Sequence, residues 1–146
     1  MTARDTLIAV SPPDHGAEHE GRDGPMLSAL SNEMVALYKT QLGRGPTKVR
    51  SNWAGADALL VTLEDSLTPA EQRLVEMGEH GRLRDTRTFF QYATAAEFIE
   101  VAERLTNRRV RAFVSGIDTA KDVSSEVFYF DPEVEPAAIA GAGNDN

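Results

Sequence analysis

A glycine-rich segment near residue 45 carries two cations that could bind a small anion. Residues 43–48 read GRGPTK, so Arg44 and Lys48 flank two glycines whose backbone N–H groups could face an oxyanion. The segment lacks the G-x-x-x-x-G-K-[ST] spacing of a phosphate-binding loop. It also follows a predicted helix C-terminus, whose dipole disfavours anions. A helix stop with solvated cations is therefore favoured, and an anion site stays the alternative.

A second pair of cations lies in the middle of the chain. Arg84 and Arg87 are three residues apart, so they share a face if this segment is helical. Such a pair could bind a carboxylate or an inorganic oxyanion. The commoner outcome is that these side chains are solvated or pair with a neighbour such as Glu79.

Basic and aromatic residues also alternate along the predicted strands, where they could gather on one face of a sheet. Single-stranded nucleic acids bind to faces of this composition. The predicted members of this face are Lys48, Arg50, Arg109, Arg111, Phe113 and Tyr129. Because Val127 would lie among them, and because the recognition-module signature is missing, a protein-partner surface is favoured over nucleic acid.

No cluster of residues predicts catalysis or metal binding. The three histidines are His15, His19 and His80, and no further ligands accompany them at zinc-site spacing. The chain has no cysteine, no H-E-x-x-H and no serine in G-x-S-x-G context. We therefore expect a non-enzymatic protein without a cofactor or a metal.

The elements that would position these residues are organised around residues 67–71, which read LTPAE. Thr68 can cap a helix, Pro69 suits the first helical position, and Glu71 can reach back to the Thr68 N–H. Together they form a capping box at the start of a short helix.

Hydrophobic periodicity predicts the other elements. Pro25 is expected to open a helix that ends at Gly43, and a longer helical stretch runs from about 83 to 106 with a kink and a second capping box at Thr94. Strands are expected over 47–53, 58–64, 108–116 and 125–131. The predicted fold is α+β, ordered α-β-β-α-α-β-β, with a four-stranded, mainly antiparallel sheet and the helices packed on one face.

The ends of the chain differ from its middle. Residues 1–25 and 132–146 lack a sustained apolar period and are acidic, so we expect a disordered N-terminal tail, one domain over 26–131 and a disordered C-terminal tail. Of the net charge of −8, the middle contributes little. No apolar run approaches the roughly 20 residues of a spanning helix, and no signal peptide is evident, so a cytoplasmic protein is expected.

Several of these segments, in this order and spacing, resemble the MpsC family. The resemblance rests on GRGP at 43–46, LTPAE at 67–71, Glu103-x-Leu105-Thr106 before Val110, then Asp118 and Val127-Phe128, and it covers about 27–131. It implies a link to a Na+-translocating membrane-potential-generating system and to inorganic-carbon (bicarbonate) uptake, without catalytic residues. Asn107 replaces the glycine that commonly follows Leu-Thr in the family, so the turn there is expected to differ.

The function expected from these observations is that of a small accessory or regulatory binding module. We expect a homodimer that forms through the outer sheet face or an adjacent strand edge, with a membrane protein as a candidate partner. The alternatives are a small-anion sensor that uses Arg44, Lys48, Arg84 or Arg87, and a single-stranded nucleic acid binding protein.

Overall fold

The computed structural model describes the backbone of residues 14–133 and the side chains from Asp23 onward. Its elements are α2 (Asp14–Leu42), β1 (Lys48–Trp53), β2 (Ala58–Glu64), α3 (Pro69–Glu76), α4 (His80–Ala93), α5 (Ala95–Thr106), β3 (Val110–Asp118) and β4 (Val123–Phe130). The predicted order of elements and the α+β class are confirmed. The predicted disorder of 1–13 and 134–146 lies outside the described residues.

Helix α2 begins earlier than the sequence suggested. It starts at Asp14, and Pro25 lies inside it rather than at its first turn. The predicted helix start at Pro25 is therefore wrong, because the helix continues beyond this residue in the N-terminal direction. From residue 27 onward, the predicted apolar stripe packs into the core through Leu30, Met34 and Tyr38, which are fully buried.

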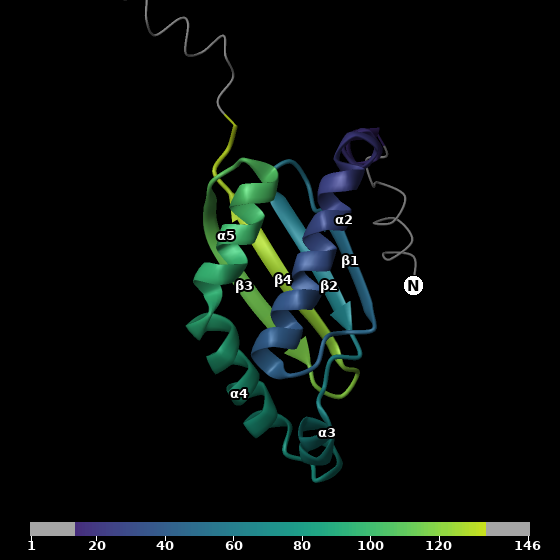
Figure 1. The fold of residues 1–146 in the computed structure, drawn as a ribbon, viewed down its shortest axis with the longest axis vertical. Coiled ribbons are helices and arrows are strands. Elements are labelled where there is room, and N and C mark those ends of the chain that lie inside the picture. The colour runs from purple at the N-terminus through teal and green to yellow at the C-terminus, as the bar shows by residue number, and fades with distance from the viewer. Residues whose placement is uncertain (1–13, 134–146) are drawn as a thin grey trace, which may run out of the picture.

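The four strands form one antiparallel sheet in the order β1-β2-β4-β3. Figure 1 shows α2 and α5 lying over one face of this sheet, with α4 running on towards α3 at one end of the molecule. Alternate residues of the central strands point to the helices and are buried, among them Leu59, Val61, Phe128 and Phe130. The core therefore lies between the sheet and the two covering helices.

A β-bulge changes which side chains of β3 face the core. Val110 pairs with Phe130 and Ala112 pairs with Tyr129, so one extra residue is inserted between them. Beyond the bulge Phe113 points inward, stacked on Phe98 at 5.8 Å between ring centroids. The prediction that Phe113 belongs to the outer face is wrong, because the bulge reverses the alternation.

The predicted capping box at the start of α3 is confirmed. The Thr68 hydroxyl accepts from the Glu71 N–H at 3.2 Å, and the Glu71 carboxylate accepts from the Thr68 N–H at 2.9 Å. The helical break at Thr94 is also present, but its predicted capping box is not. The Thr94 hydroxyl instead donates to the Phe90 carbonyl at 2.7 Å, and Thr94 is the C-cap of α4.

The turn between α5 and β3 is held by residues of the E-x-L-T segment. Asn107 has φ = 55°, the left-handed conformation that glycine takes readily and asparagine tolerates better than most residues. The Glu103 carboxylate accepts from the Val110 N–H at 2.9 Å, and the Thr106 hydroxyl donates to the Ala102 carbonyl. Asparagine thus accommodates a conformation that suits glycine.

The edge strand β3 is covered in part by α4. The backbone N–H of Ser115 donates to the Tyr92 hydroxyl at 3.0 Å, and the Tyr92 ring lies 6.0 Å from that of Phe113. The other edge strand, β1, carries Lys48 and Arg50 as exposed side chains.

Candidate functional site

Arg44, one of the predicted anion-binding residues, binds the chain's own backbone. Arg44 donates to the carbonyls of Asp65 and Leu67 at 2.5 and 3.1 Å, and it forms an ion pair with the Asp65 carboxylate at 3.2 Å. Hydrogen bonds from Thr47 and Arg44 lower the pKa of Asp65. Arg44 therefore fixes the loop between β2 and α3.

Arg87 of α4 binds the same loop. Its guanidinium makes a two-pronged ion pair with Glu71, at 2.6 and 2.8 Å, and donates to the Ser66 carbonyl at 2.9 Å. The side chains of Arg87 and Glu71 are 2% and 14% exposed. Burial alone would raise the pKa of Glu71, but the bonds from Arg87 and Thr68 outweigh it and lower that pKa. Arg84 is exposed and Arg87 is buried, so the two arginines do not form one open anion site, and Arg87 pairs with Glu71 rather than with the suggested Glu79.

A third residue, missed from the sequence, completes this arrangement. Asp122, in the turn between β3 and β4, accepts from the backbone N–H groups of Ser66 and Leu67 at 2.9 and 3.2 Å. Three segments that are distant in sequence thus converge on the loop at 65–68, which we call the clasped loop. The GRGP segment contributes Arg44 to these contacts, and the LTPAE segment contributes Leu67 and Glu71.

The remaining predicted cations lie at the surface. Lys48 and Arg50 are exposed on the outer side of β1, Arg109 is exposed just before β3, and Arg84 lies beside His80 on α4. Arg111 lies in the bulge, with its guanidinium 5.6 Å from the Tyr129 ring centroid. The structure therefore brings Arg111 and Tyr129 together, but it places Lys48 and Arg50 at the opposite edge of the sheet.

The outer sheet face, on the side away from α2 and α5, is ordered in rows across the strands. Pairing places Lys48, Glu64, Val123 and Asp118 in one row, and Arg50, Thr62, Ser125 and Gly116 in the next. The third row is Asn52, Leu60, Val127 and Val114, and the fourth contains Ala58, Tyr129 and Ala112. One end of this face is charged and the other is mostly apolar, and Val114 remains 49% exposed.

A buried acid lies on the opposite, inner face. Glu126 is fully buried, and its Oε1 accepts from the hydroxyls of Tyr38 at 2.6 Å and Ser115 at 3.0 Å. Its Oε2 has no hydrogen-bond partner among the described residues. Burial raises the pKa of Glu126 to about 7. The sequence analysis did not include Glu126, although its alternation with Phe128 and Phe130 along the strand indicates a position on the core side.

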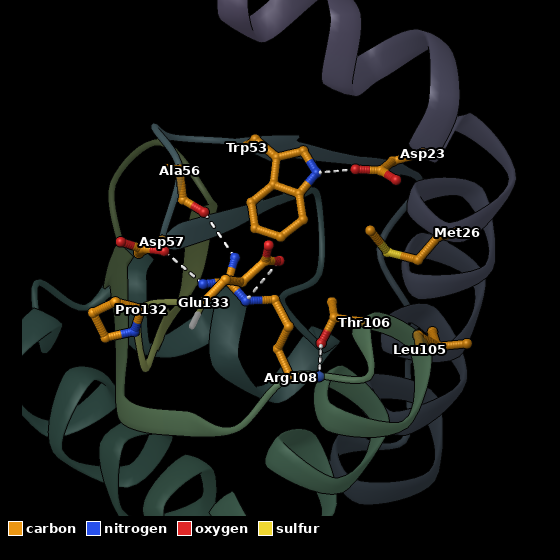
Figure 2. Close-up of a pocket in the computed structure, with 10 residues that line it drawn as sticks. All are labelled: Asp23, Met26, Trp53, Ala56, Asp57, Leu105, Thr106, Arg108, Pro132 and Glu133. Atoms are coloured by element: carbon orange, nitrogen blue, oxygen red, sulfur yellow. Dashed lines mark hydrogen bonds and ion pairs between the residues drawn. The ribbon is translucent and has the colours of Figure 1, made fainter. Parts of the chain in front are cut away.

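An open hollow of about 580 Å³ lies at the far end of the sheet from α3 (Figure 2). Met26 of α2, Trp53 of β1 and Leu105 of α5 give it an apolar wall. Its polar residues include three carboxylates and one guanidinium, and the sequence interpretation did not include any of them as site residues. They are Asp23, Asp57, Glu133 and Arg108.

Arg108 lies at the centre of the hollow, where its Nη1 and Nη2 donate hydrogen bonds and its buried Nε has no hydrogen-bond partner among the described residues. It donates to the Ala56 carbonyl at 2.8 Å, to the Asp57 carboxylate at 2.5 Å and to the Asp131 carbonyl at 2.9 Å. The Glu133 carboxylate lies 3.4 Å from its Nε. Its guanidinium also lies 5.8 Å from the Trp53 ring centroid. Arg108 therefore ties the β1–β2 turn to the end of β4.

Two further properties concern the described part of the chain as a whole. No three His, Cys, Asp or Glu side chains within it are grouped in a way that could hold a metal ion. None of its helices combines the length and the apolar character that crossing a bilayer requires.

Comparison with known proteins identifies the family of the chain. No curated protein and no solved structure matches the chain significantly. The family model described as "Na+-translocating membrane potential-generating system (MpsC)" matches residues 22–132, from the described part of α2 to just beyond β4. The clasped loop, the α5–β3 turn and the whole sheet lie inside this match, and the chain belongs to the MpsC family.

Proposed function

We propose that this protein is a cytoplasmic, non-enzymatic accessory module of the membrane-potential system after which its family is named. In this proposal it acts through protein contacts and forms a homodimer through its outer sheet face. The observation that carries the proposal is the ordering of that face into a charged end and an apolar end, which α2 and α5 leave uncovered.

The apolar rows favour a protein partner. Leu60 and Val127 are neighbours at the centre of the sheet, and Val114 and Tyr129 extend the apolar area on either side. Large apolar areas on a protein surface are typical of interaction sites. Two such sheets can pack face to face with their side chains interdigitated, as the two layers of a β-sandwich do.

The charged row favours a second copy of the same chain. A two-fold axis parallel to the strands, midway between β2 and β4, would lay β1 of one protomer over β3 of its partner. Lys48 would then face Asp118 of the partner, and Leu60 would face Val127, in both halves of the dimer. An interface of this symmetry must be self-complementary, and this face meets that condition in charge and in hydrophobicity.

The internal use of Arg44 and Arg87 supports a non-catalytic role and weakens the anion-sensor alternative. The guanidinium groups of both arginines donate hydrogen bonds to carbonyls and carboxylates of the chain itself. A free anion at either arginine would compete with the clasped loop. The exposed cations Lys48 and Arg50 stay open to a partner of opposite charge.

A charge-swap experiment tests the homodimer. Lys48→Asp and Asp118→Lys each place two like-charge pairs in the proposed dimer, while an equimolar mixture of the two variants restores two opposite-charge pairs. Each exposed ion pair contributes about 0.2–1 kcal/mol, and each single variant reverses the sign of two such pairs. We therefore expect the free energy of dimerisation of each variant alone to be about 2 kcal/mol less favourable than that of the mixture, or roughly thirty-fold in Kd. Sedimentation equilibrium at low salt measures the three constants.

The matched control is Lys39→Asp, which makes the same charge change on the exposed side of α2. Its dimer constant should equal that of the wild type. The proposal fails if the wild type stays monomeric at micromolar concentration and above, or if the mixture associates no better than either variant alone. Saturable binding of single-stranded DNA that is lost in Arg50→Ala would favour the nucleic-acid alternative instead.

A further inference from the structure

We propose that the hollow around Trp53 binds an apolar peptide segment that carries a lysine or an arginine. This inference is independent of the proposed dimer, because the hollow lies at the end of the sheet, beside α2 and the end of α5, rather than on the outer face. It rests on the charge of the lining, on the apolar wall and on the engagement of Arg108.

The charge of the lining favours a cation. Three carboxylates line the hollow, those of Asp23, Asp57 and Glu133, against the single guanidinium of Arg108. Asp23 already accepts from the Trp53 Nε1–H at 2.9 Å, so Glu133 is the acid that an incoming cation meets first. Asp57 lies 2.5 Å from Arg108 and offsets its charge. Helix α5 also ends here, at Leu105 and Thr106, and the negative end of a helix dipole favours a nearby cation.

An anion has poor access to the donors of Arg108. Its Nε makes no hydrogen bond among the described residues, but this atom is buried and lies 3.4 Å from the Glu133 carboxylate. The guanidinium already serves the Ala56 and Asp131 carbonyls and the Asp57 carboxylate, and its side chain is 11% exposed. An anionic ligand would have to displace Glu133 and would remain close to Asp57. Glu133 is 74% exposed at the mouth of the hollow, where its carboxylate is accessible to an incoming cation.

The apolar wall requires more of the ligand than a charge. Met26, Trp53 and Leu105 come from three different elements and face the same space. A volume of about 580 Å³ lies within the range of sites that bind drug-sized ligands, and these sites combine apolar walls with a few polar groups. A cationic side chain with apolar neighbours in the same peptide satisfies both the wall and the carboxylates.

The single tryptophan of the chain makes this site directly observable. The probe is an acetylated and amidated tripeptide, leucine–arginine–leucine, added to the full-length protein at low salt while Trp53 emission is recorded. The matched probes replace the arginine by glutamine or by glutamate. We expect a saturable change in emission with the arginine peptide, weaker binding of the glutamine peptide, and no binding of the glutamate peptide.

Variants of Glu133, at the mouth of the hollow, test how much of the peptide affinity depends on charge. Glu133→Gln should weaken binding of the arginine peptide about three-fold, the size of one exposed ion pair, and Glu133→Lys should weaken it further. Raising the salt concentration should reduce the wild-type affinity and narrow its difference from Glu133→Gln. The matched control is Glu76→Gln on α3, an exposed acid at the other end of the molecule, and it should bind as the wild type does.

Three results would overturn the proposal. The first is equal binding of the arginine and glutamine peptides, and the second is wild-type affinity in Glu133→Lys. The third is a full-length protein that does not respond to the peptide, while a variant ending at Glu133 does. That result would assign the hollow to the chain's own residues 134–146. Binding of the arginine peptide by a protein shown to be monomeric would support this site and refute only the dimer.

Discussion

The buried acid Glu126 should make the protein less stable at neutral pH than at mildly acidic pH. In the folded protein its pKa is about 7, against an ordinary value of 4.5. Between these two pH values the folded chain holds a proton that the unfolded chain has released. Raising the pH through this window therefore favours unfolding, and the stability that protonated Glu126 contributes is lost as the pH passes about 7.

The size of the effect follows from that difference. One pH unit across the window is worth about 1.4 kcal/mol, so the free energy of unfolding should fall by about 3 kcal/mol between pH 4.5 and 7.5. Below this window the trend reverses. Glu71 and Asp65 have lowered pKa values, and their stabilisation is lost as the pH falls through those values. We therefore expect maximal stability near pH 5.

Urea denaturation at a series of pH values, followed by circular dichroism, measures this profile. Glu126→Gln keeps the shape of the protonated acid without its titration, so its stability should change little between pH 5 and 7.5 and should exceed that of the wild type at pH 7.5. Tyr38→Phe removes a hydrogen bond that lowers the pKa of Glu126, so its decline should extend to higher pH. Parallel profiles for the wild type and Glu126→Gln would refute this reasoning.

Substitutions at three further positions test the contacts of the clasped loop and the turn between α5 and β3. Arg87→Met should destabilise the protein by about 3–5 kcal/mol in urea denaturation, because it leaves the half-buried Glu71 carboxylate without its partner; a loss below 1 kcal/mol would contradict this role. Asp122→Ala should cost about 2 kcal/mol, since two loop N–H groups lose their acceptor and a residue with φ = 55° becomes alanine, whereas Asp122→Asn should cost less. Asn107→Gly should be neutral or stabilising in thermal melts, while Asn107→Val should destabilise by about 1–2 kcal/mol, because a β-branched residue resists φ = 55°.

Local signals predicted most of the fold. The box at Thr68 and Glu71 was readable because both of its hydrogen bonds join residues three apart, and the strand at 58–64 was readable from its continuous apolar run. The bulge before Ala112 was not readable, since an inserted residue leaves the composition of a strand unchanged while reversing its faces.

The site was less predictable because its contacts are long-range. Arginines such as Arg44 and Arg87 look alike in sequence whether they bind an external anion or the chain's own carbonyls. Only their partners, 16 to 23 residues away, tell the two apart. The hollow around Arg108 joins four separate segments, and no spacing within one segment could indicate it.

The hydrogen bond from Ser115 to Tyr92 has a consequence for self-assembly beyond the folded chain. The unpaired backbone N–H and C=O groups of an edge strand can form hydrogen bonds with a strand of another molecule, and fibrils grow by this pairing. On β3 a tyrosine from α4 occupies one of these groups, so an invading strand would first have to displace that helix. On β1 the protection is electrostatic. If the β1 strands of two copies paired in register, Lys48 and Arg50 of one copy would lie next to Lys48 and Arg50 of the other, and these like charges repel. Neutralising both side chains should therefore lower the concentration at which the protein aggregates.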